Sequence, residues 1–441
     1  MNGVQLSLYD IEYEKYKITK PIRLIELFSG YGSQALALRY LGVPFERWKI
    51  CEWAIKSIQA YKDIHFTDKD IELNSQRTKK EMVEFLYQKG ISSNYNEPMT
   101  KEQINRLSEE QLKTIIKNIA ITHNLVNIQQ VKGKDLEIVD TDKYCYIMTY
   151  SFPCQDLSLA GKGKGMSDTS TRSGMLWEVE RILQECKDLG NLPQILLMEN
   201  VPQVHSQDNL PDFNKWKLRL EELGYNNYFQ DLIATDFEIP QTRNRCFMVS
   251  ILGEYSYTFP KPIPLKLKLK DMLEDNVDEK YYIDDDLLQH IIKTKQEHPE
   301  YTQYDRYNGA FEQLCRVWKD KAPTLHTKSK DIKIYEYRKQ LTETILNVKD
   351  IEKTQMLDLY NRNVVPNNLC QTVDMGYHNS MRLLDKCRIR KITCKETFRL
   401  MGVKDEDFEN VAKKQSDSSL YHLAGDSIVV NVLMAIFKEM I

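Results

Sequence analysis

The chain lacks the features by which secreted and membrane proteins are usually recognised. Its nine cysteines are an odd number with no Cys-x-x-Cys spacing, which argues against a disulfide framework and against a zinc site. No run is long and apolar enough to predict a bilayer-spanning helix, and Met1 to Asp10 lacks the basic and apolar regions of a signal peptide. These absences predict a protein of the reducing cytosol, with no membrane partner and no metal.

The composition is that of an ordinary soluble protein, and the 441 residues are enough for two domains. The net charge of −3 excludes a general polycation, so a nucleic-acid partner would require locally gathered positive charge. Basic residues do gather at Lys261 to Lys270 and at Met381 to Arg399, although such runs are often plain solvated surface.

A glycine turn follows the first candidate strand. Ile22 to Phe28 is rich in apolar and β-branched residues, and a helical pattern follows from Gln34 to Leu41. Gly30 and Gly32 permit a tight turn and a close approach of backbone to ligand, although a Gly-x-Gly pair also occurs in plain turns. Glu52 ends the next candidate strand about 20 residues later, where an acid can accept hydrogen bonds from ribose hydroxyls.

Reactive side chains stand at the ends of three further candidate strands. The apolar run from Tyr144 to Tyr150 predicts a buried strand, and Cys154 follows it directly after a proline. Glu199 ends a second strand, and Arg243 and Arg245 precede a third, where their i, i+2 spacing predicts one shared face. Each also has a structural interpretation: a buried cysteine, a helix-capping acid and an edge-strand charge pair.

These segments, in this order, resemble the C5-cytosine DNA methyltransferases, and the resemblance covers most of Pro21 to Thr258 and Arg388 to Ile441. It implies a doubly wound α/β domain, the Rossmann-like fold of S-adenosylmethionine-dependent methyltransferases, with a small inserted target-recognition domain. It also implies sequence-specific transfer of a methyl group from S-adenosylmethionine to C5 of a flipped-out cytosine in double-stranded DNA, with S-adenosylhomocysteine as the product.

The expected domain organisation follows from the resemblance and from a change in composition. Residues 1–258 would form the catalytic domain, 259–386 the target-recognition domain, and 387–441 the return to the catalytic domain. The prolines between Pro260 and Pro264 mark the first boundary.

Residues 62–124 form an insertion relative to compact members of the family, and their pattern is helical. Thr78-x-x-Glu81 and Thr100-x-x-Gln103 are capping boxes, and a helical face of apolar residues follows at Ile104, Leu107, Leu112, Ile115, Ile116 and Ile119. This predicts a helical appendage that packs on the catalytic domain, with contact to DNA or a partner as the alternative.

The resemblance assigns the chemistry to four side chains. The Cys154 thiolate would add to C6 of the cytosine, so that C5 becomes nucleophilic enough to take the methyl group. Glu199 would protonate or hydrogen-bond N3 of the ring. Arg243 and Arg245 would contact the O2 of the cytosine, a phosphate or the loop that carries the cysteine.

The resemblance also places the cofactor and DNA contacts. Cofactor contacts fall at Phe28, Ser29, Gly30, Gly32, Glu52, Trp53, Asn127, Pro153, Asp426 and Ser427. Asn127 stands where the family commonly has Asp, and Asp426 stands where it commonly has Asn. DNA contacts fall at Gln155, Ser158, Lys162, Arg172, Asn200, Thr324 and Thr372, of which Thr324 and Thr372 are alternatives for one role in the recognition domain.

Two other functions compete with DNA methylation. The tRNA-methylating branch of the superfamily shares the cysteine and Glu-Asn-Val motifs, but it typically carries Cys-Phe-Thr, whereas Cys246-Phe247 is followed here by Met248. A catalytically silent DNA-binding regulator would not need the intact Cys154, Glu199 and arginine pair. We expect a monomer in the cytoplasm of a bacterial or phage-infected cell, associated with the nucleoid. A cognate restriction endonuclease is a candidate partner without a stable complex.

Overall fold

The computed structural model describes residues 13–67, 77–153, 173–282, 356–358, 363–364, 381–385 and 388–441. The chain divides into two compact units. The first unit comprises Met1–Ile233, Asn244–Pro262 and Val430–Ile441, and the second comprises Ala234–Arg243 and Ile263–Val429.

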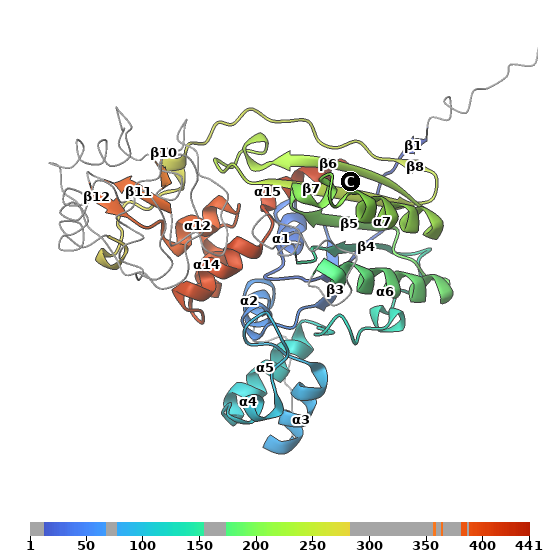
Figure 1. Ribbon diagram of the computed structural model, residues 1–441, viewed down its shortest axis with the longest axis horizontal. Helices are drawn as coiled ribbons and strands as arrows, with labels where there is room; N and C mark the ends of the chain where they lie inside the picture. The colour runs from blue at the N-terminus through green and yellow to red at the C-terminus, as the bar shows by residue number, and fades with distance from the viewer. Residues whose placement is uncertain are drawn as a thin grey trace, which may run out of the picture. The chain divides into compact units, whose positions relative to one another are not determined.

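A six-stranded sheet forms the centre of the first unit (Figure 1). Its strand order is β3-β2-β4-β5-β7-β6, in which β3, β2, β4 and β5 are parallel and β7 runs antiparallel to both of its neighbours. Every residue of β2, β4 and β5 is buried, including the charged Arg23 and Glu26 of β2, and most of these residues are apolar. The strands are β2 (Ile22–Leu27), β3 (Phe45–Cys51), β4 (Cys145–Tyr150), β5 (Ile195–Asn200), β6 (Tyr225–Ile233) and β7 (Asn244–Leu252).

Helices cover both faces of this sheet, with α6 (Leu176–Asp188) and α7 (Leu210–Leu223) on one side and α1 (Ser33–Tyr40) on the other (Figure 1). On the α6 and α7 side, alternate residues of each strand join one apolar core with the two helices. Within it, the indole nitrogen of Trp216 donates a hydrogen bond to the Tyr150 hydroxyl, 3.2 Å away. The C-terminal helix α15 (Val430–Lys438) packs against α1. The prediction of a doubly wound α/β fold is confirmed.

A helical appendage follows β3. It consists of α2 (Ile55–His65), α3 (Lys79–Lys89), α4 (Lys101–Asn105) and α5 (Glu109–Ile121). The capping boxes expected at Thr78 and Thr100 are present, and a third begins α5 at Ser108. Most of the apolar face expected in this region is buried in a separate core, with Leu107 partly buried at its margin. The appendage therefore has its own packed interior.

In the part of the second unit that the structure describes there are a small antiparallel sheet and three helices. The sheet order is β10-β9-β11-β12, with strands at Asn363–Val364, Met356–Asp358, Met381–Asp385 and Arg388–Arg390. The helices are α12 (Cys394–Leu400), α13 (Asp405–Ala412) and α14 (Asp417–Asp426). A fully buried ion pair joins the sheet to α12, because Arg390 donates to both carboxylate oxygens of Glu396 at 2.7 and 2.8 Å.

Short elements complete the described structure. A two-stranded parallel pair is formed by β1 (Glu14–Lys15) and β8 (Tyr255–Ser256). Single-turn 3-10 helices lie at Gly133–Leu136 (η1), Ser173–Met175 (η3), Pro202–His205 (η4), Ala234–Asp236 (η5), Leu269–Met272 (η6) and Glu279–Tyr281 (η7).

One expectation about hydrophobic runs was wrong. The stretch Asp417–Lys438 is long and apolar enough, by length and composition, to cross a membrane. Its apolar window is 72% buried inside the protein, however, and α14 ends at Asp426 before α15 begins at Val430. Burial of this kind is typical of core helices, whose sequences are apolar on nearly all sides.

Candidate active site

The carboxyl ends of four parallel strands lie level with one another. Leu27 of β2 is in register with Cys51 of β3 and with Tyr150 of β4, which is in register with Met198 of β5. The chain leaves β2 for β3 on one side, while β4 lies on the other side of β2. In open α/β sheets, such a switch in strand order creates a crevice where ligands bind.

The turn after β2 is held in a conformation that few residues adopt. Phe28, Gly30 and Gly32 all have positive φ, at 57°, 54° and 83°. Glycine is required at position 32 for a second reason, since a Cβ there would overlap His65 and lie 2.5 Å from the Tyr61 ring. The turn is therefore packed closely against α2.

Glu52 fixes this turn to the end of β3. One carboxylate oxygen accepts from the Gly30 amide at 3.0 Å, and the other accepts from the Ala54 amide at 2.8 Å. Glu52 is 9% exposed. Its place beside the glycine turn is the one expected of a residue that accepts from a ribose.

Asn124 is a residue that the sequence reasoning missed. Its amide oxygen accepts from the backbone N–H of Glu52 at 3.0 Å, and its amide nitrogen donates to the Glu52 carbonyl at 2.8 Å. This double hydrogen bond continues the β3 edge, where Ile50 and Asn124 form a parallel bridge. No motif or periodicity identifies Asn124, because its role depends on where the chain returns after α5.

Ser29 provides a test of whether a polar ligand fits the turn. It is 5% exposed, and its hydroxyl has no hydrogen-bond partner within the described part of the chain. Leaving a buried hydroxyl unpaired costs about 1–3 kcal/mol. A bound ligand that forms a hydrogen bond with this hydroxyl would recover that free energy. The buried hydroxyl and the strained glycine turn together fit the polar half of a nucleoside-containing cofactor.

Two expected cofactor residues, Trp53 and Asn127, make contacts within the protein in or next to the helical appendage. Trp53 is partly buried against the appendage core, which is the structural interpretation of a core aromatic. Asn127 lies in a turn, where its side-chain oxygen accepts from the Gln129 amide at 3.1 Å. Asn127 is 6% exposed. The cofactor roles of both residues stay predictions.

Glu199 and Arg245 form an ion pair at the end of β5. Arg245 Nε lies 3.2 Å from Glu199 Oε1, and the two side chains are 16% and 9% exposed. The pairing follows from the register, because Glu199 faces Phe247 of β7 and Arg245 is two residues from Phe247 on the same face. A carboxylate held in this way is positioned and shielded from bulk water.

Asn200 connects the loops that follow β4 and β5. Its amide nitrogen donates to the Phe152 carbonyl at 3.0 Å, and its oxygen accepts from the Val201 amide at 2.8 Å. Asn200 is 2% exposed, so the side chain acts within the protein. Phe152 and Pro153 are the last described residues before position 154. Outside the described residues lie Cys154, Gln155, Ser158, Lys162, Arg172, Thr324 and Thr372.

Arg243 belongs to the second unit and has different partners from Arg245. Its guanidinium donates to the carbonyls of Gly425 and Ser427, at 3.1 and 2.7 Å, and it is 4% exposed. It thereby caps the C-terminal end of α14, where the helix dipole favours a cation. The neighbouring Gln241 donates to the Leu400 carbonyl of α12 at 2.7 Å.

The two expected cofactor residues of the last motif also lie in the second unit. Asp426 ends α14, where one of its carboxylate oxygens lies 3.2 Å from the imidazole Nε2 of His422. Ser427 is buried, and its hydroxyl donates to the Leu423 carbonyl at 2.6 Å. The Asp426 side chain is 48% exposed, which leaves it accessible.

Three potential metal ligands meet on β6, β7 and η4. The ligand atoms of His205, Asp231 and Cys246 lie within 4.8 Å of one another, and His205 Nε2 is 2.9 Å from Asp231 Oδ1. Asp231 and Cys246 are direct cross-strand neighbours. Burial raises the pKa of the Cys246 thiol well above its usual range. A thiol must lose its proton to bind a metal. The raised pKa of Cys246 therefore favours a hydrogen-bonded network over a metal site at these three residues.

Comparison with known proteins gives a consistent result over nearly the whole chain. The model of the C-5 cytosine-specific DNA methylase family matches residues 90–441. The chain is 32% identical to type II methyltransferase M2.ScrFI of Lactococcus lactis subsp. cremoris, over 95% of this chain and 99% of that protein. It is 30% identical to orphan methyltransferase M.SssI of Spiroplasma monobiae, over 96% of this chain and 97% of that protein.

The fold is similar to that of the S. pombe Dnmt2 methyltransferase crystal structure. The TM-score is 0.51 at 16% sequence identity, and the match covers 94% of this chain and 97% of that chain. At 16% sequence identity, this likeness is evidence for the fold alone.

Proposed function

The chain belongs to the C-5 cytosine-specific DNA methylase family, and from this premise we propose how its residues carry out the reaction. It is a DNA (cytosine-5-)-methyltransferase, and its family implies S-adenosylmethionine as the cofactor. The observation that carries the proposal is the Glu199–Arg245 pair at the carboxyl edge of the sheet, next to the strand that leads to Cys154.

The reaction begins with a covalent bond between the protein and the base. The Cys154 thiolate adds to C6 of the cytosine, and the displaced electron pair makes C5 nucleophilic. C5 takes the methyl group of S-adenosylmethionine, which leaves S-adenosylhomocysteine. A base such as water then takes the C5 proton, which restores the C5–C6 double bond and expels the Cys154 thiolate, so that every bond formed to the enzyme is broken again.

Glu199 acts on the opposite side of the ring. As a hydrogen-bond or proton donor to N3, it withdraws electrons from C6 while the thiolate attacks. Arg245 keeps the Glu199 carboxyl group oriented through the 3.2 Å contact. Asn200 positions the cysteine loop, because its amide holds the Phe152 carbonyl two residues before that cysteine.

The cofactor is held at the crevice beside β2. Glu52 accepts from the ribose, the buried Ser29 hydroxyl supplies a donor, and Gly30 and Gly32 let the backbone approach. The remaining contacts in this proposal come from Phe28, Trp53, Asn127, Pro153, Asp426 and Ser427.

The DNA must present its target cytosine outside the helix. A base inside a duplex hides C5 and C6, so the enzyme extrudes it into the site. Arg243 contributes indirectly, by fixing the end of α14. The recognition sequence is read by residues 259–386, where Thr324 or Thr372 contacts the backbone near the target. The flipped nucleotide is held by Gln155, Ser158, Lys162 and Arg172.

A mechanism-based trap tests the chemistry. Duplex DNA containing 5-fluorocytosine should form a stable adduct through Cys154, because fluorine at C5 blocks the elimination step. Cys154→Ala should abolish methyl transfer and trapping while DNA binding survives. Failure of an active enzyme to trap, or trapping by the Cys154→Ala protein, would show that another group is the nucleophile.

A substrate comparison tests the class of nucleic acid. Labelled S-adenosylmethionine should methylate duplex DNA and leave tRNA unlabelled, and bisulfite sequencing of DNA from expressing cells should give the sequence context. Labelling of tRNA alone would favour the tRNA-methylating branch. Binding of DNA without any transfer would favour a silent regulator. We further propose a cytoplasmic monomer that forms no stable complex with a cognate endonuclease.

A further inference from the structure

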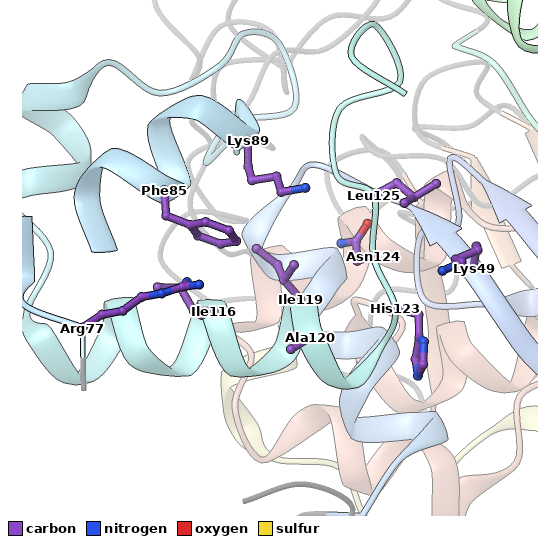
Figure 2. Close-up of a pocket in the computed structure, with 10 residues that line it drawn as sticks. All are labelled: Lys49, Arg77, Phe85, Lys89, Ile116, Ile119, Ala120, His123, Asn124 and Leu125. Carbon is purple, nitrogen blue, oxygen red and sulfur yellow. The ribbon is translucent and has the colours of Figure 1, made fainter. Parts of the chain in front are cut away.

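A pocket opens between the helical appendage and the edge strand β3 (Figure 2). Its volume is about 330 Å³. Phe85 of α3 and Ile119 of α5 form its apolar lining, and Lys49 of β3, Arg77 and Lys89 stand around it. None of these residues has a role in the proposed reaction.

The charge of the pocket has one sign. Its titratable lining residues are Lys49, Arg77, Lys89 and His123, and no acidic side chain lines it within the described part of the chain. Lys49 is neutralised by Glu137, 2.8 Å away. Arg77 and Lys89 have no ion-pair partner among the described residues. By contrast, other lysines of the appendage are paired, namely Lys101 with Glu84 and Lys113 with Glu109.

The Arg77 guanidinium is held in place by an aromatic ring. Its central carbon lies 4.5 Å from the centroid of Phe85, and the Lys89 ammonium lies 6.0 Å from the same centroid. Figure 2 shows the Phe85 ring and the Lys89 side chain directed into the pocket. A guanidinium stacked on a ring loses less freedom on binding, and its planar donors match the oxygens of a phosphate.

Asn124 connects this pocket with the carboxyl edge of the sheet. It lines the pocket, and its amide holds both backbone groups of Glu52. The pocket therefore adjoins the edge at which the substrate is expected. Since the whole chain carries a net charge of −3, its attraction for a polyanion depends on local cations such as these.

We propose that this pocket binds a backbone phosphate of the duplex DNA substrate, outside the bases that the recognition domain reads. The inference rests on the proposed function, because it takes duplex DNA as the polyanion. Arg77 and Lys89 supply the charge, and the contact adds affinity without sequence preference.

The salt dependence of DNA binding tests the proposal. We would compare the wild type with the double variant Arg77→Gln, Lys89→Gln, using fluorescence anisotropy of a 30-bp duplex at several salt concentrations. Each phosphate contact contributes about −0.9 to the slope of log K against log salt. If the double variant loses one contact, the ratio of wild-type to variant affinity should be about threefold smaller at 200 mM salt than at 50 mM salt.

The matched control removes two charges from the same appendage, outside the pocket: Lys80→Gln with Lys113→Gln, both at exposed positions. Its slope should equal that of the wild type, and thermal unfolding should show that both variants are folded. Equal slopes for all three proteins, or an equal loss in both variants, would overturn the proposal.

Methyl transfer to the same duplex, measured in parallel, separates this inference from the proposed function. Transfer by the wild type with unchanged slopes would overturn the pocket and leave the function standing. A wild type that neither binds nor methylates the duplex would overturn both.

Discussion

Arg245 Nε lies 3.2 Å from Glu199 Oε1 where β5 and β7 meet, and the two side chains are 16% and 9% exposed. The antiparallel register between β5 and β7 brings together two residues that are far apart in sequence. A buried ion pair of this kind costs about 3–5 kcal/mol when one partner is removed, because the other charge is left without compensation. It is therefore weak evidence for stability as such and stronger evidence for a positioned carboxyl group.

Replacement of Glu199 should separate catalysis from binding. We expect Glu199→Gln to lower the rate of methyl transfer by a factor of about 10² to 10⁴, since the amide cannot donate a proton to the ring. DNA affinity should change only a few-fold. Single-turnover transfer and anisotropy would measure the two quantities. A variant with wild-type turnover would remove Glu199 from the mechanism.

Replacement of Arg245 should act through Glu199. Arg245→Met removes the guanidinium beside the buried Glu199 carboxyl group and should favour its protonated form, so the pH profile of methyl transfer should shift to higher pH. Arg245→Lys keeps the charge and should shift it less. As a control, Lys143→Met breaks an exposed pair with Asp140 and should leave the profile unchanged.

Asn200→Ala should loosen the loop that leads to the cysteine. Removal of the amide leaves the Phe152 carbonyl without its donor, at a cost of about 1–3 kcal/mol in the free energy of unfolding. The rate of 5-fluorocytosine trapping should also fall. Asn226→Ala, which removes exposed hydrogen bonds to Gly253 and Tyr255, is the matched control. Identical effects of the two replacements on trapping would contradict the role given to Asn200.

Two glycines with similar backbone angles should respond differently to alanine. Gly32 and Gly42 have φ of 83° and 70°, so both substitutions carry the left-handed strain of about 1–2 kcal/mol. A Cβ at Gly42 meets nothing within 4 Å, whereas at Gly32 it meets His65 and Tyr61. Gly32→Ala should therefore lower the melting temperature further and weaken S-adenosylmethionine binding in calorimetry. Equal melting temperatures would show that the turn tolerates the added methyl group.

Glu26 should make stability fall as the pH rises towards neutrality. Burial raises the pKa of Glu26 from 4.5 to about 7, although the Tyr61 hydroxyl donates to its carboxylate. Between these values the folded protein holds a proton that the unfolded chain has lost, so the free energy of unfolding decreases by about 1.4 kcal/mol per pH unit. Above the folded pKa this loss is complete.

Glu26→Gln removes this titration. The contribution of residue 26 to the free energy of unfolding should then no longer fall as the pH rises. The variant should gain stability relative to the wild type between about pH 5 and pH 7, as measured by denaturant unfolding at each pH. Other titrating groups cancel in the difference. A constant difference across this range would mean that Glu26 ionises normally.

The sequence by itself determined the parts of this protein that depend on local pattern. Mostly apolar stretches predicted β2, β4 and β5, because strands buried on both faces are built largely from apolar side chains. The helix starts at Thr78 and Thr100 followed from capping boxes, which are formed within four residues. The order of the motifs identified the family and its fold.

Only the tertiary structure decided which side chains those motifs meet. Glu52 and Asn124 are 72 residues apart, and Arg243 lies 182 residues from the Gly425 carbonyl that it caps. Hydrogen bonds of this range depend on strand order and on the path of the connecting chain, which leave no trace in the periodicity of either segment. For the same reason the spacing of Arg243 and Arg245 suggested a shared role, whereas packing gives each arginine its own partner. The basic pocket likewise exists because α3, α5 and β3 converge in space.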